Sequence, residues 1–169
     1  LSVAAKRRDI IHAESFFRLC NDFHIKPSVD IFQKLVSIAL STNDETAALH
    51  WYHAMIQHGV QPTTEFFNVV LHVFAQEGNL ARIDFWRGIM QSTCVIPSDV
   101  TFNTLLNACS RAEDSKRLDE YLQEMQKMSI SLDERSYLAV ISTYGRCGDP
   151  QTAAGWFETM LSARIQPNV

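Results

Sequence analysis

Histidine and cysteine side chains are the first candidates for chemistry in this sequence. His50 and His53 lie three residues apart, a spacing at which two imidazoles on one helix can bind the same metal ion. No third ligand accompanies them, so a solvated or packing role is favoured and no metal site is predicted. The cysteines include no Cys-x-x-Cys pair, which favours buried free thiols and a reducing compartment. They are Cys20, Cys94, Cys109 and Cys147.

Patterns typical of enzymes are missing from the sequence. It contains no glycine-rich phosphate loop, no nucleophile elbow and no phased pair of carboxylates. We therefore expect a region that is not an enzyme, with no cofactor and no small-molecule substrate. No run approaches 18 consecutive apolar residues, so neither a membrane-spanning helix nor a membrane partner is predicted.

Composition points to a folded domain with a net negative charge. Of the 169 residues, 46% are hydrophobic and 20% are charged, which excludes intrinsic disorder and suffices for a buried core. The chain carries 15 Lys and Arg against 19 Asp and Glu, for a formal net charge of −4. Because nucleic-acid binders are normally basic, the net charge alone argues against such a partner.

Four series of residues recur with a step of 35 positions and no insertion. We therefore divide the chain into units 29–63, 64–98, 99–133 and 134–168, preceded by a partial unit, 1–28, that holds mainly a second helix. A helical repeat cannot bury its apolar face alone, so we expect further repeats or caps beyond both ends of one continuous solenoid. The series are Phe32, Phe67, Phe102 and Tyr137; Met55, Met90, Met125 and Met160; Phe16, Trp51, Trp86, Tyr121 and Trp156; and Pro27, Pro62, Pro97 and Pro167.

Each unit shows the apolar spacing of two helices. In the third unit, Phe102, Leu105, Leu106 and Cys109 follow the i, i+3, i+4, i+7 pattern of one helical stripe. A second stripe begins at Leu118. The fold class predicted is all-α, an α-solenoid of helix-turn-helix hairpins. First helices are predicted at 29–42, 64–77, 99–111 and 134–146, and second helices at 44–60, 79–92, 113–128 and 149–165.

The third and fourth units resemble a known repeat family. The segment VTFNTLLNACSRAED…LDEYLQEMQKMSISLD, from Val100 to Asp133, is similar to a pentatricopeptide repeat, and so is the last unit. The resemblance implies a right-handed superhelix in which first helices line a concave groove and second helices form the outer wall. It also implies binding of single-stranded RNA in mitochondria or plastids, at one nucleotide per repeat. Unstacked bases expose edges that a few side chains per repeat can recognise.

The resemblance further implies which residues contact a base. In the family, the fifth and last residues of a repeat read the base, and the second residue packs against it. An amide donates and accepts hydrogen bonds, whereas a carboxylate only accepts. In family terms Asn with Asp prefers uracil, and Asn with Ser leans to cytosine. The resulting pairs are Asn68 with Ser98, Asn103 with Asp133, Gln33 with Thr63, and Leu138 with Asn168.

Other positions divide between support for RNA binding and evidence against it. Val100 matches the apolar second position of the family, but Asp30 and Glu65 place carboxylates there, which repel phosphate. The family favours a basic residue at the end of the first helix, and Arg111 and Arg146 match. These two arginines can contact phosphate, or can simply stabilise the negative end of a helix dipole.

Two main functions remain open at this level. The first is an organellar RNA-binding protein that serves RNA stability, processing or translation. The second is a protein-interaction scaffold in a large organellar assembly such as a mitochondrial ribosome, with ribosomal or other assembly proteins as partners. A third possibility is the targeting half of an enzyme. Most of the negative charge falls on the predicted second helices, so the net charge does not dismiss RNA, and a nearly neutral groove predicts modest affinity.

Overall fold

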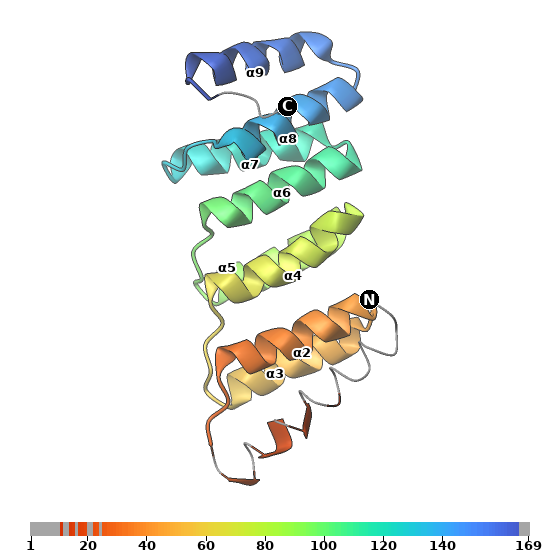
Figure 1. The fold of residues 1–169 in the computed structure, drawn as a ribbon, viewed down its shortest axis with the longest axis vertical. Helices are drawn as coiled ribbons and strands as arrows, with labels where there is room; N and C mark the ends of the chain where they lie inside the picture. Colours follow the sequence, from red (N-terminus) through yellow and green to blue (C-terminus); the bar gives the residue numbers. More distant parts are fainter. Residues whose placement is uncertain (1–10, 12–13, 16, 20–21, 24, 166–169) are drawn as a thin grey trace. The chain divides into compact units, whose positions relative to one another are not determined.

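The chain is all-helical throughout the part that the structure describes. A computed structural model describes residues 11, 14–15, 17–19, 22–23 and 25–165. Within them lie eight bounded helices and no strand (Figure 1). The predicted fold class is thereby confirmed. The helices are α2 (Val29–Ser41), α3 (Glu45–Gln57), α4 (Thr64–Glu77), α5 (Leu80–Ser92), α6 (Asp99–Ala112), α7 (Ser115–Lys127), α8 (Glu134–Arg146) and α9 (Pro150–Ser162).

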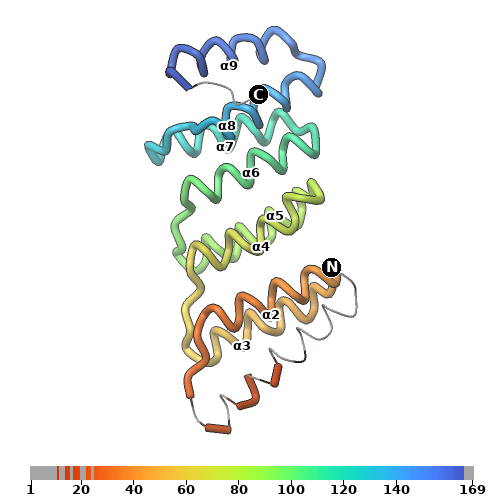
Figure 2. The backbone as a smooth tube through the Cα atoms, in the orientation of Figure 1, coloured from red at the N-terminus to blue at the C-terminus, as the bar shows by residue number. Residues whose placement is uncertain are grey.

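A short turn joins the two helices of each hairpin, and the backbone tube in Figure 2 follows these turns. After α6, Glu113 adopts a left-handed conformation with φ of 54°, and the Asp114 N–H donates to the Cys109 carbonyl at 3.1 Å. The Asp114 carboxylate then accepts from the Arg117 N–H at 3.0 Å and caps α7. One residue therefore ends the first helix and begins the second. Its counterparts in the other hairpins are Asp44, Asn79 and Asp149.

The methionine series closes the second helices. After α7, Ser129 is left-handed, and the Ile130 N–H donates to the Met125 carbonyl at 2.9 Å. This bond joins an apolar residue beyond the helix end to an apolar residue in its last turn, a common helix stop. The turn makes α3 and α9 three residues shorter at their C-termini than predicted. Equivalent bonds join Val60 to Met55, Val95 to Met90 and Ile165 to Met160, and all four methionines are buried.

The chain forms two compact units, Leu1–Val73 and Phe74–Val169. In the first, α2 packs against α3, and the core includes the fully buried Phe32, Met55 and Phe67. In the second, α6 packs against both α7 and α8, and α8 packs against α9. Fully buried aromatic and aliphatic side chains of this unit include Trp86, Phe102, Leu105, Leu106, Leu118 and Val140.

The cysteines depart from the expectation of buried thiols. Cys109 is buried in α6, and burial raises the pKa of its thiol to about 12, so it stays protonated. Cys94 and Cys147 are exposed, because they lie in the turns after α5 and α8 instead of on an apolar helix face. Cys20 falls outside the described residues, as does most of the predicted partial unit 1–28. None of the helices in the described part is long and apolar enough to cross a bilayer.

Candidate functional site

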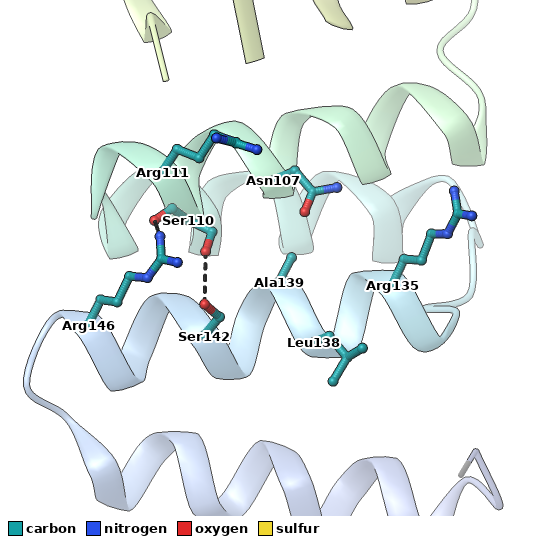
Figure 3. A pocket seen from close by; sticks show the side chains of 8 residues that line it. All are labelled: Asn107, Ser110, Arg111, Arg135, Leu138, Ala139, Ser142 and Arg146. Carbon is teal, nitrogen blue, oxygen red and sulfur yellow. Dashed lines mark hydrogen bonds between the residues drawn. The ribbon is translucent and has the colours of Figure 1, made fainter. Parts of the chain in front are cut away.

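A pocket of about 480 Å³ lies along the first helices α6 and α8 of the second unit (Figure 3). Three arginines contribute to its lining, and no carboxylate does. Such a surface attracts anions, because the guanidinium charges are not offset within the pocket. The lining residues are Asn107, Ser110, Arg111, Arg135, Leu138, Ala139, Ser142 and Arg146. We call this pocket the α6/α8 groove.

Small side chains bring the two helices of the groove together. The Ser110 hydroxyl lies 3.2 Å from the Ser142 hydroxyl and donates to it, and Ala139 lies beside them. Arg146 donates from Nη1 to the Ser110 carbonyl at 3.0 Å, near the C-terminal end of α6. This bond supports the helix-terminus role considered for Arg146. It engages one of the five guanidinium N–H groups. Arg111 is exposed and lines the same groove.

A second cluster joins Asn103 to Asp133, one of the residue pairs predicted to read a base. The Asn103 Nδ2 donates to Asp133 Oδ2 at 2.9 Å. The Asp133 Oδ1 accepts from the Ser136 N–H at 2.8 Å and thereby caps α8. The Ser136 hydroxyl contacts both residues: it lies 2.9 Å from Asp133 Oδ1 and donates to Asn103 Oδ1. We call these three residues the Asn103 cluster.

Electrostatics links the Asn103 cluster to the groove. Partial burial raises the pKa of Asp133, but the Ser136 N–H and hydroxyl, the Asn103 amide and the nearby Arg135 charge together lower it below its usual value. The carboxylate is therefore ionised at neutral pH. Because Arg135 also lines the groove, the two features are parts of one surface on α6 and α8.

Two apolar side chains flank these polar groups. Val100, at the predicted stacking position, is 53% exposed in the first turn of α6. Leu138 is 40% exposed and lines the groove. An aliphatic side chain offers a base a flat apolar contact but no hydrogen bond, so these positions suit packing and not edge recognition.

The other residues predicted to read a base lie at helix starts, on first helices or outside the described residues. Ser98 caps α6 together with Thr101, whose hydroxyl accepts from the Ser98 N–H at 2.9 Å, and its partner Asn68 belongs to the first unit. Within the first unit, Gln33 lies on α2, and Thr63 precedes α4 and accepts from the Phe66 N–H at 3.2 Å. Asn168 lies outside the described residues. For all of them the base-contacting role stays a prediction.

Sequence reasoning did not find Ser136, Asn107 or Ser142. Ser136 follows Asp133 by three residues, and this spacing of a cap and its partner is a recognisable signal for a helix start. No such signal marks Asn107 or Ser142, because their place in the groove depends on how α6 and α8 pack. His50 and His53 are exposed on α3, and the described residues contain no group of three metal-ligating side chains.

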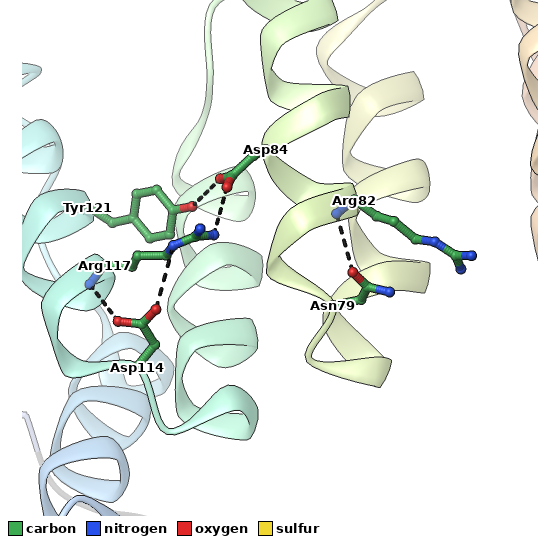
Figure 4. A network of polar contacts seen from close by, with 6 residues as sticks. All are labelled: Asn79, Arg82, Asp84, Asp114, Arg117 and Tyr121. Carbon is green, nitrogen blue, oxygen red and sulfur yellow. Dashed lines mark hydrogen bonds and ion pairs between the residues drawn. The ribbon is translucent and has the colours of Figure 1, made fainter.

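The second helices α5 and α7 carry a separate network of opposite charges (Figure 4). Arg117 pairs with Asp84 at 2.7 Å and with Asp114 at 3.5 Å. Arg87 binds Glu124 through two contacts of 2.7 and 2.8 Å. The Arg117–Asp114 pair lies within the stretch 113–127 itself. Arg117 and Glu124 of this stretch also pair with α5, through Asp84 and Arg87.

Comparison with known proteins gives the family of this arrangement. A family model described as the pentacotripeptide-repeat region of PRORP matches residues 24–168. No curated protein matches the sequence.

Solved structures of repeat proteins share the fold. The pentatricopeptide repeat protein PPR10 from maize is 17% identical, with a TM-score of 0.78 over 99% of this chain and 25% of its own. The same protein in complex with an 18-nt psaJ RNA element is 21% identical, with a TM-score of 0.69 over 98% of this chain and 24% of its own. The PPR domain of Arabidopsis thaliana protein-only RNase P 1, in complex with tRNA, is 21% identical, with a TM-score of 0.65 over 82% of this chain and 74% of its own. The chain thus spans about a quarter of PPR10.

Proposed function

Because this chain belongs to the pentatricopeptide-repeat family, we propose that it binds single-stranded RNA along the first helices of its hairpins. The observation that carries the proposal is the α6/α8 groove, whose lining includes Arg111, Arg135 and Arg146 and no carboxylate. Lysine and arginine contacts to phosphate supply most of the affinity of such complexes. The complexes of PPR10 with psaJ RNA and of the RNase P 1 domain with tRNA support the same use of the fold.

Base selection in this proposal comes from the Asn103 cluster. Asn103 presents an amide beside an ionised carboxylate, and Val100 offers an exposed apolar surface one turn earlier on α6. This combination suits a base held by packing and recognised at its edge. We expect uracil at this position. Leu138 has no polar atom, so the nucleotide at the following position is bound without edge recognition.

The cellular part of the proposal follows the family. We propose a role in RNA stability, processing or translation in a mitochondrion or plastid. The proposal contains no catalytic step for this region.

A scaffold in a large organellar assembly is the second candidate. Asp30 and Glu65 support it, since both are exposed in the first unit at the positions that would pack against a base. Carboxylates at these positions repel the phosphate chain. In this case ribosomal or other assembly proteins would bind the solenoid, and any RNA contact would depend on phosphate alone.

Binding of the chain to randomised single-stranded RNA across a salt series tests the proposal. We expect pyrimidine enrichment, with uracil at one position that is lost in Asn103→Ala. Arg111→Ala should weaken binding to all sequences and reduce the slope of log K against log salt by about 0.7, the value for one phosphate contact on a single strand.

The matched control is Lys116→Ala, which removes one positive charge from an exposed position on α7, away from the groove. It should leave the slope unchanged. Weak binding without an enriched motif, and with equal slopes for both variants, would reject RNA reading and favour the scaffold.

A further inference from the structure

Both polar atoms of the Asn103 amide are hydrogen-bonded, and we propose that Ser136 stabilises the orientation in which this amide meets a base. Ser136 is a positioning residue in this proposal, and it does not itself contact RNA. It lies in the first turn of α8 and is 1% exposed. The inference rests on the proposed function, and it concerns the choice between uracil and cytosine at the Asn103 position.

The hydrogen bonds around the amide favour one orientation. Asn103 Nδ2 donates to Asp133 Oδ2 at 2.9 Å, and the Ser136 hydroxyl donates to Asn103 Oδ1. A hydroxyl has one proton, and Asp133 Oδ1 already accepts from the Ser136 N–H at 2.8 Å. The hydroxyl lies within hydrogen-bonding distance of two acceptors, Asp133 Oδ1 at 2.9 Å and Asn103 Oδ1. While Nδ2 donates to Asp133, the amide oxygen faces the Ser136 oxygen, so placing the proton between them avoids a contact between two bare acceptors.

Reversing the amide would lose the bond to Asp133 and would leave Ser136 as an acceptor from Asn103 instead of a donor to it. The amide oxygen would then face the Asp133 carboxylate, so two acceptors would repel each other. The amide nitrogen would face the Ser136 oxygen, and the hydroxyl proton would have to turn to an oxygen of Asp133 that is already bonded. Asp133, which only accepts, thus selects the orientation, and the Ser136 hydroxyl stabilises it by donating to the amide oxygen.

A fixed amide distinguishes two bases that a rotating amide cannot. After these bonds, Asn103 retains one N–H and one lone pair for a ligand. Along its pairing edge, uracil presents an acceptor, O4, and then a donor, N3–H. Cytosine presents a donor, N4–H, and then an acceptor, N3. The order is reversed between the two bases, so an amide that is free to rotate by 180° matches both, and a held amide matches one.

The burial of Ser136 makes this control effective. A solvent-exposed serine exchanges its partners with water, whereas a hydroxyl with 1% exposure must find its partner within the protein. Threonine occupies the equivalent position of the preceding hairpin, as Thr101, where it is fully buried. Serine and threonine are therefore both compatible with the first turn of these helices.

The test compares variants of the whole chain on a randomised RNA pool and measures the uracil-to-cytosine ratio at the position that depends on Asn103. Ser136→Ala removes the hydroxyl and keeps the backbone bond to Asp133. We expect the ratio to fall about threefold to tenfold, the range for loss of one hydrogen bond, with little change in affinity for the whole pool. Ser136→Thr should restore the ratio.

Thr143→Ala is the matched control, because Thr143 is also a buried hydroxyl of α8 but donates within its own helix, to the Ala139 carbonyl at 2.7 Å. Its ratio should equal that of the wild type, and helix content by circular dichroism verifies the folding of each variant. An unchanged ratio in Ser136→Ala would overturn the inference. A wild-type chain without RNA binding or without base preference would overturn the proposed function as well, which is a distinct result.

Discussion

Single residues in this protein serve folding and the proposed recognition at the same time. Asp133 caps α8 through the Ser136 N–H and holds the Asn103 amide with its other oxygen. Arg146 stabilises the end of α6 through the Ser110 carbonyl while it lines the groove. A substitution at either position therefore changes stability and RNA binding together, and the two effects have to be measured separately.

Acid should weaken the fold through Asp133. Its folded-state pKa lies below the usual value, so ionisation stabilises the protein above the unfolded-state pKa, and this stability is lost as the pH falls through the folded-state pKa. Asp133→Asn keeps a capping side chain without the charge. We expect the wild type to be the more stable at neutral pH, with the difference closing in acid, in urea unfolding followed by circular dichroism. A difference that stays constant with pH would contradict this assignment.

Helices in this chain begin and end at positions that were readable from the sequence. The predicted breaks between 29–42 and 44–60 and between 64–77 and 79–92 fall at the left-handed Asn43 and Gly78, each of which is followed by a capping side chain. Such a pair of residues is a local signal. The early ends of α3 and α9 were missed, since the apolar stripe continues past them to Val60 and Ile165, which fold back onto the last turn through a backbone bond.

Two glycines give a matched test at the scale of the element. Both are left-handed, with φ of 65° at Gly78 and 77° at Gly148. A Cβ on Gly78 would lie 3.2 Å from the Arg111 Cβ, whereas one on Gly148 would meet no atom within 4 Å. Gly148→Ala should cost about 1 kcal/mol for the left-handed conformation alone, and Gly78→Ala should cost more.

Thermal and urea unfolding measure the difference between the two glycine variants. Because the added methyl group at Gly78 displaces the end of α6, where Arg111 lies, Gly78→Ala should also weaken RNA binding. Equal stability of the two variants would show that the end of α6 can shift away from the added methyl group with no loss in the free energy of unfolding.

The features of the whole molecule that follow from the 35-residue repeat could be predicted from the sequence, whereas contacts that depend on helix packing could not. Four phased residue series gave the helical hairpins, and the family resemblance selected Asn103 with Asp133, which are in contact, and the separate residues Arg111 and Arg146, which both line the groove. Two other features depend on the distance between α6 and α8. They are the hydrogen bond from Ser136 to Asn103 and the position of Arg135 in the pocket lining. No local pattern in the sequence encodes that distance.

RNA binding should affect the two compact units unequally. The first turns of α2 and α4 carry the exposed Asp30 and Glu65, while those of α6 and α8 carry Val100 and Arg135. Hydrogen exchange with and without RNA should show added protection at the starts of α6 and α8 and little at the starts of α2 and α4. Equal protection of all four helix starts would contradict a contact centred on the groove.

The need to cap a helix limits which residue types can occupy the last position of each repeat, where a base is proposed to be read. The last residue of a repeat is the proposed second reader of a base, and it is also the residue that starts the next first helix: Thr63, Ser98 and Asp133 each accept a backbone N–H in this way. Only a few residue types do so well, chiefly Asn, Asp, Ser and Thr. Asn168 belongs to the same set by sequence. A new base preference can therefore be designed at this position with four residue types at little loss of stability. Any other residue would remove the helix cap and destabilise the fold.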